Sequence, residues 1–317
     1  LYAVAGVRDL RPAAIAAAAG EPLRLTDLQS TLEVLAAAGI PALVLKGSAL
    51  AYDLYASPDQ RPRGDTDLLV PRSSFDSARA VLRAEGFDER RTSGDEHGIR
   101  QVSFSRTDRL GAKHVYDLHW EAVNSPVIGD AFRQDRLVRR PLPAIGPAAA
   151  TLPWPEALLL ACVHRVLHHY DDGRLIWLAD IAFLRRAMSA EEHARFWRLA
   201  AEHRLVAICR RSVALADSWM GESGSPAEDF LTRAELARIE PSARFLDPDV
   251  TYGGVMLTNL QALPWRMRIT RLRQLALPPT EFIRESFPGW SRSALPWLYA
   301  YRAARGIVRL FRRERGG

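Results

Sequence analysis

Hydrophobic and polar positions in the first half of the chain alternate between helical and strand spacing. Residues 26–38 (TDLQSTLEVLAAA) carry apolar side chains at helical spacing after the N-cap candidate Thr26, and Gly39 follows as a stop. The short apolar run 41–47 (PALVLKG) enters a glycine and predicts a buried strand. The same rules predict helices at 48–55 and 73–87 and strands at 65–70, 101–106 and 114–122. This interleaving predicts an α/β (α+β) fold with a mixed sheet.

The second half has a different pattern. Residues 139–157 (RRPLPAIGPAAATLPWPEA) contain five prolines, which is typical of a domain junction. Beyond Pro155 the apolar spacing is helical, and prolines interrupt the helical pieces after residue 253. The predicted helices are 156–169, 174–187, 190–201, 203–219 and 231–239. We therefore expect two domains, 1–150 with the sheet and 151–317 mainly helical.

Composition and charge narrow the class of protein. The 317 residues contain no run that approaches the roughly 18 apolar residues of a membrane span. Cys162 and Cys209 are too few for a disulfide framework and match no metal motif, so we expect reduced thiols and a cytoplasmic location. Residues 1–150 are neutral overall, and the net charge of +6 lies in residues 151–317.

The C-terminal tail concentrates this positive charge. Residues 265–317 contain 12 Arg and 3 Glu. Such a tail could contact a phosphate-rich partner or an anionic membrane surface. In the alternative, its apolar residues dock on the protein and its arginines are solvated.

Two aspartates in RPRGDTDLLV (61–70) indicate a candidate metal site. Asp65 and Asp67 are two residues apart on a predicted strand, so their side chains point to one face and repel each other unless a positive charge lies between them. A dinuclear Mg²⁺ site for phosphoryl or nucleotidyl transfer needs carboxylates that bridge ions about 3.5–4 Å apart. A turn with a capping aspartate is the alternative for this pair.

Two further segments fit such a site. Asp117 in HVYDLHW shares a strand face with Val115 and His119, and it could complete one metal and accept a proton from the attacking hydroxyl. The segment KGS (46–48) lies where a strand turns into a helix. There, glycine permits close backbone approach, and the free N–H groups at a helix start favour phosphate.

These residues carry a family resemblance. The order strand–Gly-Ser–helix, Asp-x-Asp on a strand and a later Asp on a strand resembles the nucleotidyltransferase fold of the DNA polymerase β superfamily. More narrowly, LVLKGSAL, RPRGDTDLLV and YDLHW are similar to the motifs of a bacterial family of uncharacterised nucleotidyltransferases. The segment HHYDDGRLIWLADIAFL (168–184) resembles that family's helical half. The resemblance spans about residues 30–185 and covers the tail beyond about 220 weakly.

The resemblance implies a mixed sheet with flanking helices and a role for each matched residue. Gly47 and Ser48 would hold the β- and γ-phosphates of a nucleoside triphosphate. Asp65 and Asp67 would hold two Mg²⁺ ions, for which Mn²⁺ can substitute. Asp117 would join the catalytic ion and act as base. The loop between Ser48 and Asp65 is longer than is usual in the wider superfamily and matches the narrower family.

Nearby residues add candidates with open alternatives. Lys46 is a triphosphate contact or a lysine at a strand end. Arg61 and Arg63 flank the aspartates and could clamp phosphate in a bidentate way, or lie exposed in a loop. His119 bonds an aspartate, lines the sugar pocket or is a half-buried histidine without a role.

The helical half offers further candidates. Arg174, Trp177 and Asp180 lie mostly on one side of a predicted helix, and they could close over the nucleotide or serve packing and an internal ion pair. Three histidines form a helical cluster that is a candidate metal site, a substrate contact or a structural feature: His164, His168 and His169. We include His169, Arg174 and Asp180 as second-domain contacts.

The predicted function is transfer of a nucleoside monophosphate from a triphosphate, with ATP expected, to an acceptor hydroxyl or phosphate with release of pyrophosphate. Three acceptor classes stay open: a small molecule such as an aminoglycoside or sugar, a tRNA end, and a protein hydroxyl. One alternative is a non-catalytic nucleotide-binding protein, although such a protein does not need all three aspartates. Another is a metal-dependent phosphohydrolase that uses the histidine cluster.

Overall fold

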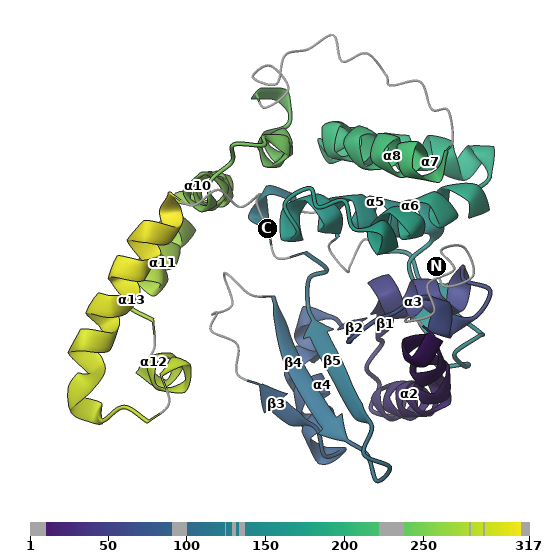
Figure 1. Cartoon of the computed structure of the whole chain (residues 1–317), viewed down its shortest axis with the longest axis horizontal. Helices are drawn as coiled ribbons and strands as arrows, with labels where there is room; N and C mark the ends of the chain where they lie inside the picture. The colour runs from purple at the N-terminus through teal and green to yellow at the C-terminus, as the bar shows by residue number, and fades with distance from the viewer. Residues whose placement is uncertain are drawn as a thin grey trace.

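The structure is a computed structural model that describes residues 11–90, 100–123, 125–128, 131–132, 137–221, 238–278, 280–287 and 289–311. A mixed sheet lies beside a layer of helices, and the last helices form an arm that projects from this body (Figure 1). None of the helices in the described ranges has the length and apolarity that crossing a bilayer requires.

The sheet has five strands in the order β1-β2-β5-β4-β3. Their bounds are Leu43–Leu45 for β1, Thr66–Leu69 for β2, Asp88–Arg90 for β3, Gln101–Thr107 for β4 and Lys113–His119 for β5. Strands β2 and β5 are parallel, and the other neighbouring pairs are antiparallel. The parallel pairing sets Asp67 opposite Asp117, so two predicted site residues become neighbours.

The alternation of side chains divides the sheet into two faces. Leu68, Tyr116 and Leu118 point to one face, where they form a core with α2 (Arg11–Ala37) and α4 (Phe75–Ala84). Leu43, Leu45 and Leu69 point to the other face and join the core of the helical layer. Asp67, Asp117 and His119 share this second face, because residues two apart on a strand point the same way.

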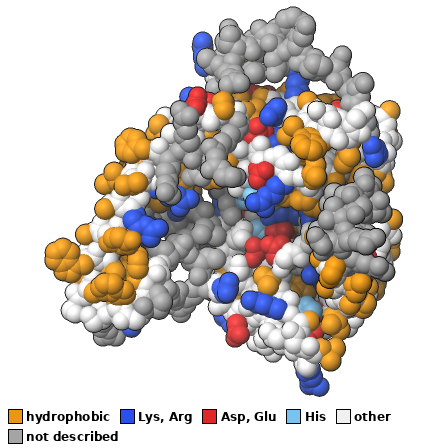
Figure 2. All heavy atoms as spheres, in the orientation of Figure 1, with side chains coloured by type: hydrophobic (Ala, Val, Ile, Leu, Met, Phe, Trp, Pro, Cys, Tyr) orange, Lys and Arg blue, Asp and Glu red, His pale blue; other side chains and the backbone are white. Residues whose placement is uncertain are grey.

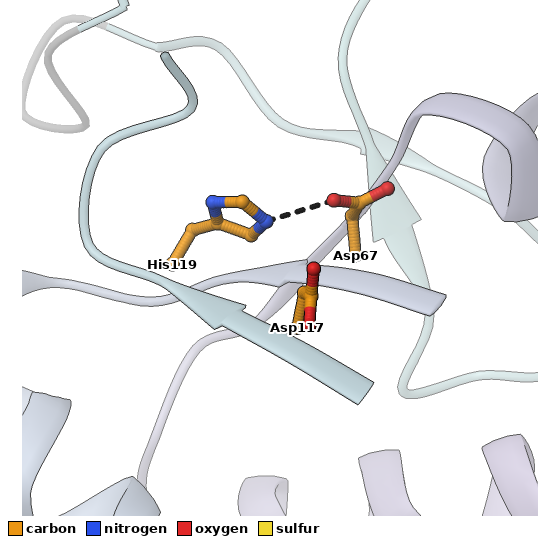
Figure 3. Close-up of side chains that lie close together, drawn as sticks. All are labelled: Asp67, Asp117 and His119. Atoms are coloured by element: carbon orange, nitrogen blue, oxygen red, sulfur yellow. Dashed lines mark hydrogen bonds and ion pairs between the residues drawn. The ribbon is translucent and has the colours of Figure 1, made fainter. Parts of the chain in front are cut away.

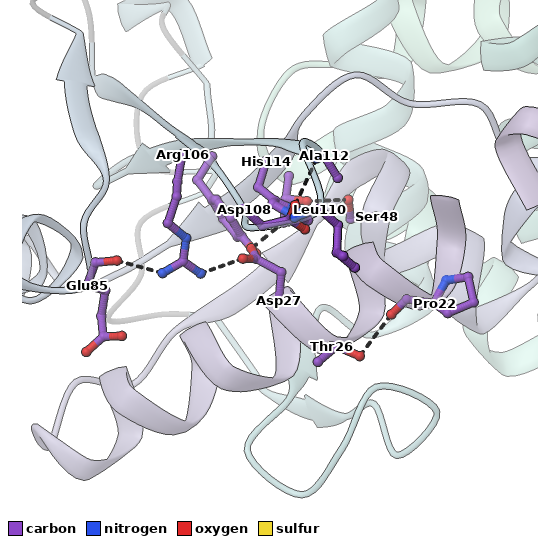
Figure 4. A network of polar contacts seen from close by, with 12 residues as sticks. Pro22, Thr26, Asp27, Ser48, Glu85, Arg106, Asp108, Leu110, Ala112 and His114 are labelled. Atoms are coloured by element: carbon purple, nitrogen blue, oxygen red, sulfur yellow. Dashed lines mark hydrogen bonds and ion pairs between the residues drawn. The ribbon is translucent and has the colours of Figure 1, made fainter. Parts of the chain in front are cut away.

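A buried carboxylate fastens α2 to the sheet (Figure 4). Asp27 is 8% exposed, and Arg106 of β4 donates to it. The Tyr116 hydroxyl of β5 donates to the second Asp27 oxygen at 2.7 Å. Arg106 also donates to the Glu85 carbonyl at 2.6 Å and lies 4.2 Å from the centre of the Phe87 ring. A buried carboxylate is favourable only when it is paired in this way, so α2 has one defined position on the sheet.

Short elements connect the sheet to the helical layer. The helix α3 (Lys46–Asp53) follows β1 without a loop, and a two-stranded ladder of β6 (Arg140–Pro141) and β7 (Ala150–Thr151) precedes the helices. The 3-10 turns are η2 (Pro58–Gln60), η3 (Arg72–Ser74), η4 (Pro126–Ile128), η7 (Pro241–Leu246) and η8 (Arg292–Ala294).

The helical layer consists of α5 (Trp154–Val163), the π-helical turn η6 (His164–His168), α6 (Leu175–Ala187), α7 (Ala190–Glu202) and α8 (Val206–Met220). Ser189 and Glu192 form a capping box at the start of α7. Gly221, at a φ of 71°, ends α8 in the left-handed conformation that glycine favours. Cys162 and Cys209 are both buried and free, as the sequence predicted. The arm contains α10 (Tyr252–Ala262), α11 (Trp265–Ala276), α12 (Thr280–Ser286) and α13 (Leu295–Leu310).

The structure confirms the α/β fold class with its mixed sheet and corrects some boundaries. The helix predicted from Thr26 begins at Arg11, because the alanine-rich run 13–19 favours a helix and Pro22 is tolerated inside it. Thr26 is therefore no N-cap, and its hydroxyl donates to the Pro22 carbonyl. Strand β3 has the pattern exposed, intermediate, exposed and carries charged residues, so hydrophobic spacing did not reveal it. The helix predicted at 231–239 lies largely outside the described residues.

A buried ion pair joins the sheet half to the helical half. Arg61 precedes β2, and its Nε and Nη2 atoms donate to Asp180 of α6 at 2.9 and 2.7 Å. The Tyr55 hydroxyl donates to the same carboxylate at 2.8 Å. Arg61 is 7% exposed and Asp180 is 4% exposed. The internal ion pair that the sequence left as the alternative for Asp180 is therefore present.

Asp180→Ala should destabilise the protein by about 3–5 kcal/mol, because it leaves the buried Arg61 guanidinium without its counter-charge. The matched control is Asp172→Ala, which removes an exposed pair with Arg174 and should change the free energy of unfolding by less than about 1 kcal/mol. Urea unfolding of both variants measures the difference. Equal losses in the two variants would contradict the proposed tie between the halves.

Candidate active site

The parallel pairing of β2 and β5 creates a cluster of three ligand-bearing side chains. Asp67, Asp117 and His119 each place a candidate ligand atom within 4.8 Å of the others (Figure 3). Asp67 is 6% exposed and His119 is 1% exposed, whereas Asp117 is intermediate. Among the described residues, this is the one group of three such side chains that lie close enough to share a metal ion.

Positive and polar groups neutralise Asp67. Lys46 Nζ donates to Asp67 Oδ1 at 2.7 Å, and His119 Nε2 lies 2.8 Å from the same oxygen. Burial alone would raise the pKa of Asp67, but Lys46 and His119 outweigh it and hold this pKa far below its ordinary value. Asp67 is therefore ionised at neutral pH.

Asp65 has the opposite electrostatic environment. It stands one residue before β2 and is the most exposed of the three aspartates. Partial shielding from water, together with the charges of Asp67 and Asp117, raises the pKa of Asp65. A bound cation would relieve this repulsion.

Strand β4 holds Asp117 in place. Gln101 Nε2 donates to Asp117 Oδ2 at 2.8 Å, and the Ser103 hydroxyl donates to Oδ1. Sequence reasoning missed both partners. The sequence showed only that two polar residues occupy alternate positions of a predicted strand. It did not show that Ser103 pairs with Asp117 across the ladder.

The KGS segment forms the turn between β1 and α3. Lys46 adopts a positive φ of 51°, which is uncommon for a residue with a side chain. A Cβ on Gly47 would lie 3.1 Å from Arg61 Nη1, so glycine leaves room for the guanidinium. Ser48 is 1% exposed, and its hydroxyl lies 3.2 Å from the Asp65 carbonyl and 3.1 Å from the Thr66 hydroxyl.

A cavity of about 530 Å³ lies between the sheet and the helical layer. In the space-filling view, acidic side chains lie next to basic ones and histidine near the centre of the body (Figure 2). The predicted site residues that line the cavity are Lys46, Gly47, Arg63, Asp65, Asp67, Asp117, His169, Arg174 and Asp180. Ser48 and the candidate His119 are not among the lining residues. The volume lies within the range of about 300–1,000 Å³ that is typical of ligand sites.

The two arginines before β2 are not exposed loop residues. Arg61 pairs with Asp180 as described above. Arg63 pairs with Glu21 of α2, and it donates to the Pro58 and Arg61 carbonyls at 2.9 and 3.1 Å. Both guanidinium groups therefore hold the loop 58–64 while they face the cavity.

The three histidines form one wall of the cavity. The His164 ring centre lies 5.0 Å from that of His168 and 4.6 Å from that of His169. Burial lowers the pKa of His168 to about 3 and the pKa of His164 well below its ordinary value, so both rings are neutral at neutral pH. Their nitrogens do not form a group of three metal ligands in the described part of the chain.

An aromatic stack extends this wall. His169 stacks on Trp177 with ring centres 3.9 Å apart, and the Arg174 guanidinium lies 5.1 Å from the centre of the Trp177 ring. Burial and the charge of Arg174 lower the pKa of His169. The residues expected to close over a nucleotide are thus brought together, while Asp180 is engaged by Arg61.

The donor set of the site fits a divalent cation. Asp67 and Asp117 supply carboxylate oxygens, which are the ligands that Mg²⁺ and Mn²⁺ prefer. Asp65 lies outside this group of three and lines the same cavity. The Nδ1 atom of His119 is buried and has no hydrogen-bond partner, so the imidazole retains an unused polar atom beside the cluster.

The chain is similar to a family of known sequences and to a solved structure. The search of curated proteins finds no match to the chain. The solution structure of the antibiotic-resistance factor ANT(2'')-Ia matches 63% of this chain and 99% of its own, with 12% sequence identity and a TM-score of 0.40. The family model described as uncharacterised nucleotidyltransferase matches residues 3–221. This match spans more than half of the chain and confirms the resemblance read from the motifs, so the chain belongs to the uncharacterised nucleotidyltransferase family and is a nucleotidyl-transferring enzyme.

Proposed function

We propose that the protein transfers a nucleoside monophosphate from ATP to an acceptor hydroxyl or phosphate and releases pyrophosphate. One observation carries this proposal: Asp67 and Asp117 lie side by side on neighbouring strands at the wall of the cavity. Residues 1–150 would bind the triphosphate and metal, and residues 151–317 would supply the wall that faces the acceptor. The cleft between two domains is a common place for a ligand.

Asp65, Asp67 and Asp117 would hold two Mg²⁺ ions, and Mn²⁺ could substitute. The bound ions would neutralise triphosphate charge and stabilise the attacking and leaving oxygens. Lys46 and His119 supply part of that neutralisation in the ligand-free protein, because both contact Asp67 Oδ1. Lys46 lines the same cavity and would pair with the phosphates when Asp67 holds a cation.

Lys46 and the backbone at Gly47 would contact the β- and γ-phosphates. The helix α3 begins at this turn, where unpaired N–H groups favour an anion. Because the Ser48 hydroxyl is engaged by the Asp65 carbonyl and Thr66, any contribution of Ser48 would come from its backbone N–H group. Arg63 would add positive charge from the loop side.

In the transfer step, the acceptor oxygen attacks the α-phosphorus as its proton moves to Asp117. The bond from the α-phosphorus to the bridging oxygen breaks, and pyrophosphate leaves with the electron pair. Gln101 and Ser103 keep Asp117 aimed at the cavity, because each donates to one carboxylate oxygen. Positioning and charge stabilisation supply most of the catalysis in such reactions.

The helical half would meet the acceptor with flat, uncharged rings and one guanidinium. His169 and Trp177 stack, and Arg174 lies over Trp177. The same wall argues against a phosphohydrolase that uses His164, His168 and His169, since these do not form a ligand group among the described residues. Incubation with labelled ATP and Mg²⁺ in a lysate, followed by separation of small molecules, RNA and protein, assigns the acceptor class.

Asp65→Asn and Asp67→Asn should each abolish transfer, because a metal-holding charge contributes several kcal/mol to the transition state. Their effects on the metal-free protein should differ in sign. Asp65→Asn removes a repulsion and should leave the melting temperature unchanged or raised. Asp67→Asn removes the partner of Lys46 and His119 and should cost about 2 kcal/mol of stability. Asp76→Asn, on the exposed side of α4, is the matched control for both measurements. Near-native turnover in either site variant would contradict the metal assignment.

ATP with Mg²⁺ should raise the melting temperature by mass action. At a concentration of 100 times Kd the stabilisation is about 2.7 kcal/mol, and chelation of the metal should remove most of it. Adenosine should have little effect, since the phosphates and metal make most of the charged contacts. Differential scanning fluorimetry with ATP, AMP and adenosine measures this. Equal shifts with adenosine and ATP would exclude a triphosphate site at the aspartates.

Asp117→Asn should separate binding from turnover. Asparagine retains a carbonyl oxygen for the metal and keeps the shape, but it loses the basic oxygen that accepts the acceptor's proton. We expect Mg²⁺–ATP affinity to fall only a few-fold while turnover is lost. Calorimetry and turnover on the same preparation test this, with Gln101→Ala as a positioning variant that retains partial activity. If Asp117→Asn retains turnover, another group is the base.

A further inference from the structure

The helical arm lies outside the region that matches the family and exposes an unusual number of large apolar side chains. The family match ends at residue 221, and the arm begins at α10. Its exposed apolar residues are Leu257, Trp265, Ile269, Leu272, Leu277, Trp290, Trp297, Tyr301, Ile307, Val308 and Phe311. The orange side chains along the arm in Figure 2 show part of this surface.

Helix α11 presents its apolar stripe to solvent. Trp265, Ile269 and Leu272 are spaced as i, i+4 and i+7, so they lie on one face of the helix. They are 64%, 57% and 47% exposed. No residue of α11 is buried. Met267 and Arg271 lie on the opposite side and are less exposed, so the Trp265–Ile269–Leu272 stripe is the side of α11 that faces solvent.

Helix α13 also presents an apolar stripe to solvent. Trp297, Tyr301 and Val308 are spaced as i, i+4 and i+11, and they are 77%, 52% and 64% exposed. Phe311, three residues beyond Val308, is 78% exposed. Leu298 is the buried residue of α13 and lies on another side of the helix. Tyr301 and Val308 also line a groove of about 790 Å³ with Leu272 of α11, which joins the two stripes.

Several arginines of the arm bind within it instead of covering these stripes. Arg302 donates to the Leu275 carbonyl at 2.8 Å, and Arg268 donates to the Leu263 carbonyl at 2.7 Å. Arg309 lies 4.1 Å from the centre of the Tyr252 ring. Arg266 and Arg305 instead lie over the outward Trp265 and Tyr301 rings, at 5.3 and 5.7 Å. The exposed surface is therefore a mixture of aromatic, aliphatic and guanidinium groups.

We propose that this surface binds the face of an anionic lipid bilayer. Residues 265–311 contain nine Arg and two Glu and have no Asp or Lys, so the arm is strongly positive and complements acidic headgroups. Trp and Tyr favour the headgroup region, and exposed Ile, Leu, Val and Phe bury in the acyl boundary. Because no described helix can cross the bilayer, the arm lies in the interface.

The positive charge of the arm and its exposed apolar side chains argue against other binding partners. A second copy of the chain would bring two positive arms together, which is repulsive. A nucleic acid would match the arginines but would leave the aliphatic side chains exposed to water. A bilayer with acidic lipids satisfies both kinds of group.

Vesicle flotation with the full chain tests this proposal. The chain should float with phosphatidylcholine vesicles that contain phosphatidylglycerol, bind pure phosphatidylcholine vesicles at least about tenfold more weakly, and lose binding as salt is raised. The double variant Trp297→Ala/Val308→Ser should lower binding by about tenfold or more. The matched control Trp219→Ala, at an exposed tryptophan of α8, should bind as the unmodified chain does. Unchanged circular dichroism and nucleotidyl transfer in both variants would exclude unfolding as the cause.

Three outcomes would overturn the proposal. One is equal binding by the double variant and the unmodified chain. The second is retention on duplex RNA with no flotation, which would assign the arm to nucleic acid. The third is concentration-dependent dimerisation without lipid that the double variant abolishes, which would assign the stripes to a self-interface. None of these depends on the nucleotidyl-transfer assay, so the membrane proposal and the proposed function can fail separately.

Discussion

The neutralisation of Asp67 is the interaction on which the site depends. Parallel pairing of β2 and β5 forces Asp67 and Asp117 together, and like charges in a shielded site are costly. Lys46 and His119 offset this repulsion, because both contact the same Asp67 oxygen. To reach it, Lys46 adopts a positive φ at the end of β1, so the turn that begins α3 follows from the electrostatics of the strand beside it. The KGS turn and the paired aspartates are thus one structure.

The loop before β2 connects this site to the helical half. Arg61 is held by Asp180 and Tyr55 from one side and passes within contact distance of Gly47 on the other. Arg63 returns to α2 through Glu21. A displacement of α6 would therefore act on the KGS turn through the Arg61 guanidinium, since buried ion pairs are costly to break. This coupling gives the ion pair a role in geometry in addition to stability.

Periodicity predicted much of this site. Side chains alternate on a strand, so Asp117 and His119 could be assigned to a shared face from the sequence, whereas Asp65, which was expected to share a strand face with Asp67, stands one residue before β2. Strand order could not be predicted, because the parallel neighbour of β2 is β5 and two strands lie between them in the chain. For the same reason, Gln101 and Ser103 were missed although their strand was predicted. The role of Ser48 depends on how tightly α3 packs against β2, which local sequence does not encode.

The arm shows a different limit of periodicity. A stripe such as Trp265, Ile269 and Leu272 predicts an amphipathic helix, and the simplest expectation is that the stripe faces the protein. In the structure, Arg302 donates to a carbonyl and Arg309 lies over a ring within the arm, and the apolar stripe is left exposed. Long arginine side chains can do this because their stems pack while their heads find acceptors. An amphipathic pattern therefore predicts that a helix has an apolar and a polar side. Which side the protein covers depends on the carbonyl groups and rings that its arginines can reach. The side that is left open then requires a partner of its own.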